Sequence, residues 1–398
     1  MPGTIAVKAT HRLTRRANER LVLRTIYEDG PLSRADVARA TELTRTTVSD
    51  LVERLLAEGL VAEAGTGPST GGKAPILLRV PADARQLIGV DVDRERLSGV
   101  IIDLRGEVLV REARQLEGCD GRAALDELEA LVLFLRQTAD RPLVGIGVGA
   151  PGLIDTASGT VRWAVGLDWR DEPVGRRLAA ASGLPTVVVN DSQAAAMAEW
   201  TFGHHVTGGA MVVVKVGEGI GAGIILDGRL YAGDESGAGE IGHTRVVEDG
   251  PICRCGGSGC LETVASERAV LARAQAEADV RGDWALAGRA VNHAALLSAF
   301  EAGDAVARAI VFESAPPLGR VVGAMIGTLG ARDVVFVGPM ADYGEAWLEQ
   351  VRTEAARSAL PLLVERATIH LGRTGDDVVE LGAAAMLMTS ELGLALAA

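Results

Sequence analysis

One strand pattern occurs twice in this sequence and limits the folds that the chain can adopt. Apolar residues alternate with polar ones after Val80 and then change to a helical spacing. They predict the order strand, strand, strand, helix, strand, helix over residues 87–92, 97–103, 107–112, 122–138, 143–148 and 172–182. A strand at 186–189 and a helix at 192–202 follow, and a new strand pair at 210–216 and 223–226 repeats the opening. A repeated unit of this kind predicts an α/β body of two lobes, whose interface is a common ligand site.

Length and composition narrow the class of protein further. A chain of 398 residues is long enough for two or three domains of about 150 residues. Aromatic residues make up only 3% of the sequence, which argues against a stacking platform for single-stranded nucleic acid. No apolar run has the roughly 20 residues of a membrane span, and Arg and Thr stand where a signal peptide has its apolar core. We therefore expect a cytoplasmic protein with no membrane association.

The charge is divided unevenly along the chain. Residues 1–79 hold 12 Lys and Arg against 9 Asp and Glu, a net charge of +3, whereas the remainder holds 28 against 44, a net charge of −16. The first 25 residues contain six basic side chains and only one acid, Glu19. Such a basic arm is attracted to phosphates, although a solvated tail has the same composition.

Three short helices are predicted in the basic segment, over residues 18–28, 33–40 and 44–59. Ser33 and Thr44 are suited to cap the second and third helices through their hydroxyl groups. The short connection at 41–43 has the length of the turn in a helix-turn-helix, in which the later helix enters the major groove. The glycine-rich turn at 65–72 lies between two apolar stretches and predicts a hairpin wing.

This segment is predicted to bind double-stranded operator DNA. The third helix begins with short hydrogen-bonding side chains and one Arg, which suit phosphates and base edges. A trihelical protein-interaction domain is the alternative. The candidate DNA-binding residues are Arg34, Thr44, Arg45, Thr46, Thr47, Ser49 and, at the tip of the wing, Lys73.

Three of the four cysteines lie within eight residues, at Cys253, Cys255 and Cys260, on a glycine-rich loop. Thiolates on such a loop can surround one soft ion, and zinc favours four nitrogen or sulfur ligands. His243, ten residues upstream, is the candidate fourth ligand. We predict one structural Zn²⁺ per chain; free buried thiols or a redox pair are the alternatives.

Polar residues also occur where the chain passes from strand to helix or turn. Asn190 and Asp191 end a strand and face the crevice of an α/β sheet, or simply cap the next helix. The glycine-rich turn at 215–223 is suited to hold phosphate through its N–H groups, but Glu218 favours a purely structural turn. Glu240 and Glu262 flank the cysteine loop and have the ordinary alternative of surface acids.

Taken together, these segments resemble the ROK family of repressors, open reading frames and sugar kinases. The most specific matches are residues 239–243, residues 253–262, and Asn190-Asp191 followed by 194–196 and Glu199. The resemblance covers nearly the whole chain. It implies an N-terminal winged helix-turn-helix followed by a two-lobed actin-like body, ribonuclease H-like with βββαβα repeated, of the sugar-kinase type. We expect the domains to span 1–80, 81–205 and 206–398.

The resemblance also implies roles for particular residues. The implied sugar contacts are Asn190, Asp191, Glu240, His243 and Glu262, and the implied zinc ligands are His243, Cys253, Cys255 and Cys260. In family kinases the residue matching Asp191 is the general base. The family, and the need for two DNA half-sites, imply a homodimer or homotetramer.

Departures from the kinase pattern decide between the family's two activities. The first phosphate loop reads Asp91-Val92-Asp93-Arg94-Glu95 in place of Asp-x-Gly-Gly-Thr, Glu218 replaces a Thr, and 337–339 lack a Gly-Gly pair. Gly166 also stands where a sugar-contacting Asn is expected. We expect no catalytic residue and little or no kinase activity. The prediction is a repressor released from its operator by a sugar or phosphosugar; the alternatives are a sugar kinase fused to a DNA-binding domain, and a regulator controlled by a protein partner.

Overall fold

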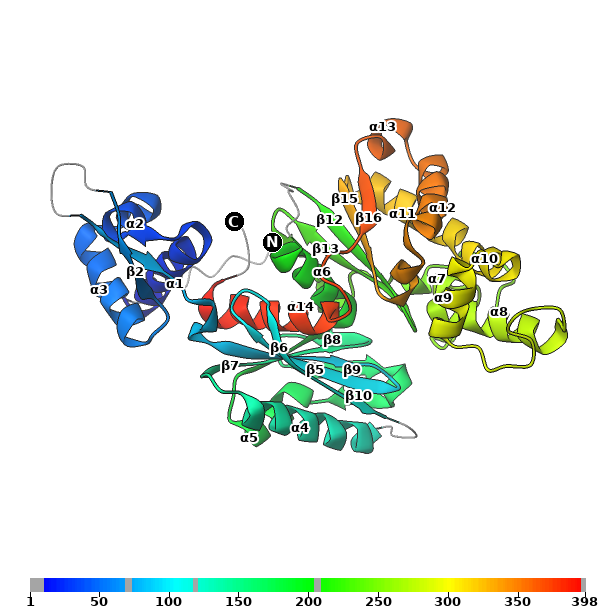
Figure 1. The fold of residues 1–398 in the computed structure, drawn as a ribbon, viewed down its shortest axis with the longest axis horizontal. Helices are drawn as coiled ribbons and strands as arrows, with labels where there is room; N and C mark the ends of the chain where they lie inside the picture. Colours follow the sequence, from blue (N-terminus) through cyan, green and yellow to red (C-terminus); the bar gives the residue numbers. More distant parts are fainter. Residues whose placement is uncertain (1–10, 69–73, 117–120, 204–208, 395–398) are drawn as a thin grey trace, which may run out of the picture.

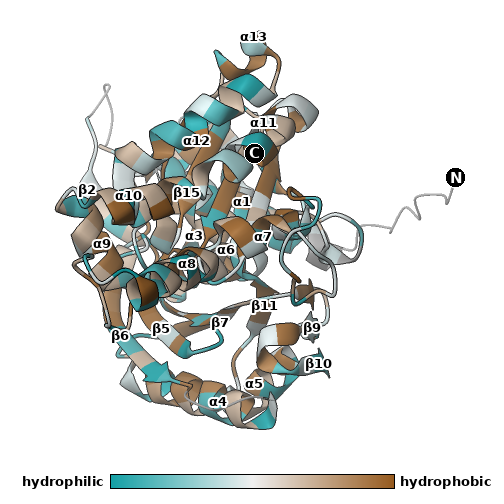
Figure 2. Ribbon diagram, turned by 90° about the vertical axis from the view of Figure 1, so that its right-hand side faces the viewer, coloured by the Kyte–Doolittle hydropathy of each residue, from teal (hydrophilic) through white to brown (hydrophobic). Residues whose placement is uncertain are grey.

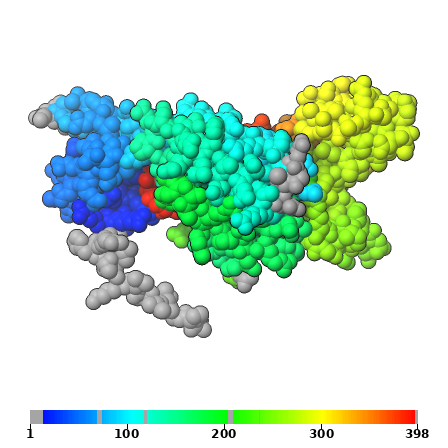
Figure 3. Space-filling model, turned by 90° about the horizontal axis from the view of Figure 1, so that it is seen from below, coloured from blue at the N-terminus to red at the C-terminus, as the bar shows by residue number. Residues whose placement is uncertain are grey.

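The computed structural model describes residues 11–68, 74–116, 121–203 and 209–394. A small head at the N-terminus is followed by two α/β lobes (Figure 1). The head lies at one end of the molecule and the helices α8 Glu267–Val280 and α9 His293–Glu301 lie at the other, with the first lobe between them (Figure 3).

The head is the predicted winged helix-turn-helix. It contains α1 His11–Asp29, β1 Leu32–Ser33, α2 Arg34–Thr41, α3 Arg45–Ala57, β2 Ala62–Thr66 and β3 Ile76–Arg79, with a three-stranded sheet in the order β1-β3-β2. Ser33 and Asp36 form a capping box at the start of α2, and the Thr44 hydroxyl accepts from the N–H of Thr47 at the start of α3. Val22, Val48 and other aliphatic residues fill its core.

The first lobe is built on a five-stranded sheet in the order β11-β7-β4-β5-β6. Its strands are β4 Gln86–Val92, β5 Arg96–Asp103, β6 Val108–Gln115, β7 Leu143–Ala150 and β11 Thr186–Asn190. The three strands β4 to β6 are antiparallel, whereas β7 and β11 add in parallel. One face packs against α4 Gly121–Thr138 and α5 Val174–Ser182, and the other faces α6 Asp191–Phe202.

The second lobe repeats this topology in the order β14-β13-β12-β15-β16. Here β12 Met211–Val216 pairs antiparallel with β13 Ile220–Leu226, which pairs with β14 Arg229–Leu230. The strands β15 Asp333–Val337 and β16 Thr368–Leu371 add in parallel. The matched order and directions confirm the repeat predicted from the sequence. The inner strands β7 and β15 are largely hydrophobic, whereas the helices α4 and α12 Gly344–Ser358 also have hydrophilic residues along their length (Figure 2).

The helices of the second lobe form a separate core. They include α7 Leu261–Ala265, α10 Ala305–Phe312, α11 Ala315–Leu329 and α13 Pro361–Val364. The long helix predicted after Asp304 is divided, because Pro316 and Pro317 occupy the first turn of α11. Among the described residues, the one helical stretch long and apolar enough to cross a membrane is 305–329, and 61% of its most apolar window is buried in this core.

Two features differ from the expected organisation. The closing helix α14 Val378–Leu387, predicted with the second lobe, packs on the first sheet and against α6, because its apolar residues share one core with Leu87 and Val189. A small sheet of β8 Leu153–Asp155, β9 Thr160–Ala164 and β10 Trp169–Glu172 was also missed. Its strands are short and half-exposed, so no long apolar alternation marks them.

The head is joined to the first lobe along α1. The Tyr27 hydroxyl donates to the carbonyl oxygen of Leu104 over 2.6 Å, and the Arg105 guanidinium lies 3.8 Å from the centre of the Tyr27 ring. Nearer the other end of α1, Arg20 contacts the turn that follows α14. The head therefore packs on the first lobe and on the closing helix.

Candidate functional site

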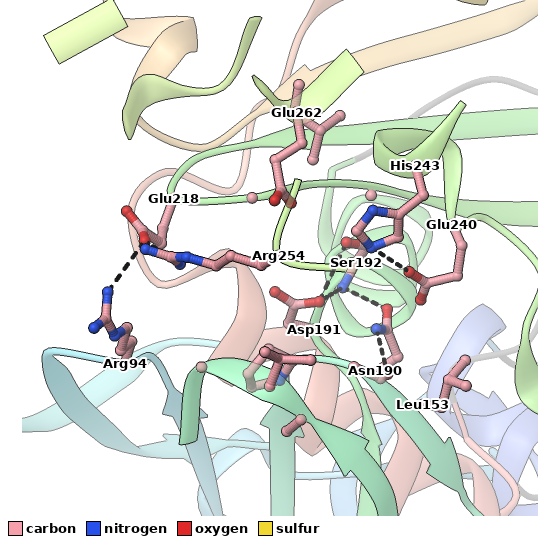
Figure 4. Close-up of a pocket in the computed structure, with 18 of the residues that line it drawn as sticks. Arg94, Leu153, Asn190, Asp191, Ser192, Glu218, Glu240, His243, Arg254 and Glu262 are labelled. Atoms are coloured by element: carbon pink, nitrogen blue, oxygen red, sulfur yellow. Dashed lines mark hydrogen bonds and ion pairs between the residues drawn. The ribbon is translucent and has the colours of Figure 1, made fainter. Parts of the chain in front are cut away.

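A pocket of about 280 Å³ lies between the two lobes, and Figure 4 shows the side chains around it. Its wall includes the β4–β5 turn, the segments 151–153 and 163–166, the start of α6, and the turn between β12 and β13. The structure brings all five predicted sugar contacts to this pocket: Asn190, Asp191, Glu240, His243 and Glu262.

Asn190 and Asp191 are presented by the junction of β11 and α6. The Asn190 side-chain oxygen caps α6 by accepting from the N–H groups of Ser192 and Gln193, and its amide nitrogen donates to the Gly152 carbonyl. Asp191 is the first residue of the helix, where the N-terminal end of the helix dipole favours a carboxylate. The alternative prediction of a cap by Asp191 is wrong in detail, because the cap is Asn190, while both residues line the pocket as the other prediction required.

Three further polar groups face Asp191 from the second lobe. His243 Nε2 lies 3.8 Å from Glu240 Oε2, and Glu262 is largely buried at the start of α7. Burial, together with the charges of Asp191 and Glu262, raises the pKa of Glu240, while His243 acts in the opposite direction. A set of carboxylates and amides with fixed positions is suited to accept hydrogen bonds from several hydroxyl groups.

The cysteine loop brings its three thiols and His243 together. The four ligand atoms lie within 4.8 Å of one another, with 3.6 Å between Cys253 Sγ and His243 Nδ1 and 3.8 Å between the Cys255 and Cys260 sulfurs. A tetrahedral zinc ion with ordinary bond lengths sets these separations at about 3.6 Å and about 3.8 Å. The donor set therefore fits zinc, and all four positions are filled by protein, as in a structural site.

The zinc arrangement also bears on the sugar contacts. Because His243 Nδ1 faces the thiols, its Nε2 remains on the pocket side next to Glu240. The predicted division of this imidazole between metal and pocket is thus compatible with the geometry. Glu262 follows Cys260 by two residues, so the loop that gathers the thiols also places this carboxylate.

A basic residue of the pocket was not among the predicted contacts. Lys215, in β12, reaches from the second lobe to Asp191, and its Nζ lies 2.7 Å from Asp191 Oδ2. Asp91, in β4, lies near the same ammonium group, and burial raises its pKa well above the usual value. Both residues stand at the edge of segments noted in the sequence, Asp91 at the start of the first phosphate loop and Lys215 at the start of the glycine-rich turn, but nothing in either pattern pairs them with Asp191.

The negative charge of Glu218, which in the sequence favoured a purely structural turn over a phosphate site, is paired in the structure. Arg254 Nη1 lies 2.8 Å from Glu218 Oε1, Arg268 Nε lies at 3.6 Å, and Arg94 of the first lobe lies at 4.0 Å. Arg268 also contacts Glu262 at 3.4 Å. Glu218 is therefore neutralised by cations, and its charge by itself does not exclude phosphate from this turn.

The first lobe supplies an apolar wall. Leu153 and Trp163 line the pocket, and Trp163 keeps 41% of its surface exposed. At Gly166, where a sugar-contacting Asn was expected, the Arg94 side chain occupies the adjacent space, with its Cδ 3.6 Å from where a Cβ would lie. Gly166 has no side chain to make the expected contact, and the Arg94 side chain packs beside it.

The predicted DNA-binding residues lie at the first turns of α2 and α3. Thr44, Arg45 and Thr46 are exposed, whereas Arg34, Thr47 and Ser49 are half-buried. Val48 points into the core of the head. Lys73 and the arm before residue 11 lie outside the described residues.

Comparison with known proteins agrees with this architecture. The model of the ROK family matches residues 87–390, which is most of the chain. This chain belongs to the ROK family. A model of the MarR family matches residues 13–67, the head of this ROK protein. The xylose repressor of Caldicellulosiruptor bescii is 31% identical over 392 residues, which cover 96% of this chain and 98% of that protein.

Two further relatives represent the family's two kinds of protein. A glucokinase of Halalkalibacterium halodurans is 30% identical over 308 residues, covering 75% of this ROK chain and 93% of the enzyme. The crystal structure of a ROK family transcriptional regulator, described as a homologue of Escherichia coli Mlc, superposes with a TM-score of 0.83 at 24% identity. It covers 95% of this chain and 97% of its own, and so confirms the fold with the head included.

Proposed function

We propose that this ROK protein is a transcriptional repressor that leaves its operator when a sugar binds between the lobes. One observation supports the proposal: a chain with a winged helix-turn-helix also has five polar side chains suited to bind hydroxyl groups around one interlobe pocket. The relationship to a xylose repressor over nearly the whole length supports it. A sugar that favours a lobe arrangement in which the spacing of the two DNA-binding heads no longer matches the operator weakens DNA binding. By thermodynamic linkage, DNA then weakens sugar binding by the same factor.

The finer roles follow from the site. Asn190, Asp191, Glu240, His243 and Glu262 are proposed to bind the sugar, and His243 with the three cysteines to hold one structural zinc ion. A homodimer or homotetramer is proposed because two half-sites need two heads. Arg34, Thr44, Arg45, Thr46, Thr47, Ser49 and Lys73 are proposed to contact DNA in a cytoplasmic protein.

The test is fluorescence anisotropy of the purified protein on DNA from its own upstream region, at fixed salt. D-xylose, D-glucose, N-acetyl-D-glucosamine and their phosphates are added in turn. Release of specifically bound DNA by one compound supports the proposal and identifies the effector class. Tight binding that none of them alters favours control by a protein partner.

A second candidate is a sugar kinase, favoured by Asp191 and by the identity to a glucokinase. The loss of the first phosphate loop opposes it, because phosphoryl transfer depends on positioning the phosphates. A coupled assay for sugar-dependent ADP release decides between them. Turnover that Asp191→Asn abolishes establishes the kinase.

A further inference from the structure

Lys215 and Asp191 form a contact between the lobes at the edge of the pocket. Lys215 belongs to β12 of the second sheet, whereas Asp191 follows β11 of the first sheet. Their side chains are 16% and 18% exposed, so the ion pair is largely shielded from water. At 2.7 Å it is a charge-assisted hydrogen bond of good length.

Both oxygens of Asp191 are held by the protein. Oδ2 accepts from Lys215, while Oδ1 accepts from the Ser192 N–H at 2.7 Å and lies 3.2 Å from the Ser192 hydroxyl. The carboxylate therefore has one orientation, with lone pairs left for a molecule in the pocket.

The Lys215 ammonium group remains charged and can donate more than one hydrogen bond. Burial acts to lower the pKa of Lys215, but the charges of Asp191 and Asp91 outweigh it and raise that pKa overall. Within the described part of the chain, Asp191 supplies the acceptor for one of its three N–H bonds. Lys215 also lines the pocket, so its ammonium group can donate to a bound molecule as well as to Asp191.

We infer that Lys215 is a specificity-determining residue of the pocket, which fixes Asp191 as an acceptor and donates to the same sugar hydroxyl. The inference rests on the proposed function and deepens it. A hydroxyl group has one donor and two acceptor positions, so Asp191 takes its proton in a hydrogen bond while Lys215 donates to its oxygen. Removal of that proton by Asp191 is opposed, because protonation of the carboxylate breaks the charge-assisted pair. The pair reads a neutral hydroxyl and does not activate it.

A double-mutant cycle tests this coupling. Lys215→Met removes the charge at similar length, Asp191→Asn keeps the shape of its partner, and the double variant removes both. Isothermal titration with D-xylose, D-glucose and N-acetyl-D-glucosamine measures the Kd, and thermal unfolding of the same four proteins measures stability. Arg229→Met, in the edge strand β14 away from the pocket, is the matched control.

Each single variant is expected to weaken binding of the recognised sugar by about 10- to 100-fold, the effect of one charged hydrogen bond. The double variant is expected to be within about threefold of the weaker single variant, because the residues act as one unit. The inference is overturned if the Kd of the double variant rises by the product of the two single-variant factors. It is also overturned if Lys215→Met lowers the Tm and leaves the Kd unchanged.

Thermal unfolding of the same four proteins distinguishes a failure of this inference from a failure of the proposed function. If none of the three sugars binds the unaltered protein, the proposed sugar response is contradicted. The ion pair is then tested by the Tm values alone. The double variant should have a higher Tm than Lys215→Met, because Asp191→Asn removes the buried charge that the first substitution leaves unpaired. Additive Tm losses contradict the pair itself.

Discussion

Arg20 of α1 donates from Nη2 to the backbone carbonyl oxygen of Glu391, over 3.2 Å, and so ties the DNA-binding head to the end of the chain. The same guanidinium contacts the Ser390 carbonyl. Both carbonyls lie in the turn that continues α14, where the negative end of the helix dipole favours a cation. Because α14 also packs on α6, and α6 begins at Asp191, a continuous set of contacts joins the pocket to α1.

Arg20→Ala is expected to reduce the coupling between sugar and DNA. Arg20 lies in α1 and not at the start of α3, where the DNA contacts are proposed, so specific DNA affinity without sugar should change by less than about threefold. Release by the effector sugar should weaken several-fold. Anisotropy titrations with and without sugar measure both quantities. Arg24→Ala is the control, since Arg24 pairs with Glu28 on the same helix. Equal sugar-induced release in both variants would show that this contact does not transmit the signal.

Removal of the metal is expected to impair sensing more than DNA binding. Cys255→Ser takes away one of four ligands, so the metal content should fall from about one zinc per chain to near zero. The loop that positions His243 and Glu262 then loses its anchor, and sugar-induced release should be lost. Elemental analysis and anisotropy are the measurements, with Cys119→Ser as control. A normal sugar response in a zinc-free variant would contradict the proposed role.

The start of α3 is expected to carry much of the DNA affinity. Arg45→Ala should weaken specific binding by about 1–3 kcal/mol if Arg45 reads a base, or lower the salt slope by about 1 if it contacts phosphate. Arg54→Ala is the control, because Arg54 lies at the opposite end of α3 and pairs with Glu19 at 3.0 Å. Titrations at several salt concentrations distinguish the two roles. Equal losses in both variants would place the DNA elsewhere on the head.

The contact between α6 and α14 is expected to be intolerant of added volume. A Cβ at Gly382 would lie 1.7 Å from the Ala194 carbonyl oxygen, so Gly382→Ala should cost about 3 kcal/mol or more of folding stability. At exposed Gly327 of α11 an added Cβ would have no atom outside its own helix within 4 Å, and Gly327→Ala should stabilise by about 0.5–1 kcal/mol. Thermal unfolding compares them. Similar Tm values for the two variants would contradict the packing.

Stability is expected to fall as the pH rises above neutrality. The hydrogen bond that His370 Nε2 donates to Asp333 raises the pKa of His370, and Glu267 raises that of His293 in the same way. A raised folded-state pKa stabilises the protein fully below the unfolded value of about 6.5, and this stabilisation is lost as the pH passes the raised pKa. Melting curves from pH 6 to 9 measure the slope, which should be shallower in His370→Asn. An unchanged slope would exclude a contribution from His370.

Local patterns in the sequence predict much of the fold. The strand alternation after Val80, the caps at Ser33 and Thr44, and the break at Pro316 each depend on neighbours a few residues away, and the structure confirms them. The same holds for the cysteine loop, since its ligands are close in the chain and glycines permit the tight path between them.

The sequence by itself therefore determined much of the secondary structure, the repeated topology and the side chains suited to a sugar and a metal. Only the tertiary structure decided that α14 packs on the first lobe, that three arginines surround Glu218, and that Lys215 meets Asp191. The physical reason is that packing and charge pairing act through space between elements far apart in the chain. Spacing along the sequence does not encode those distances, and the pocket depends on them.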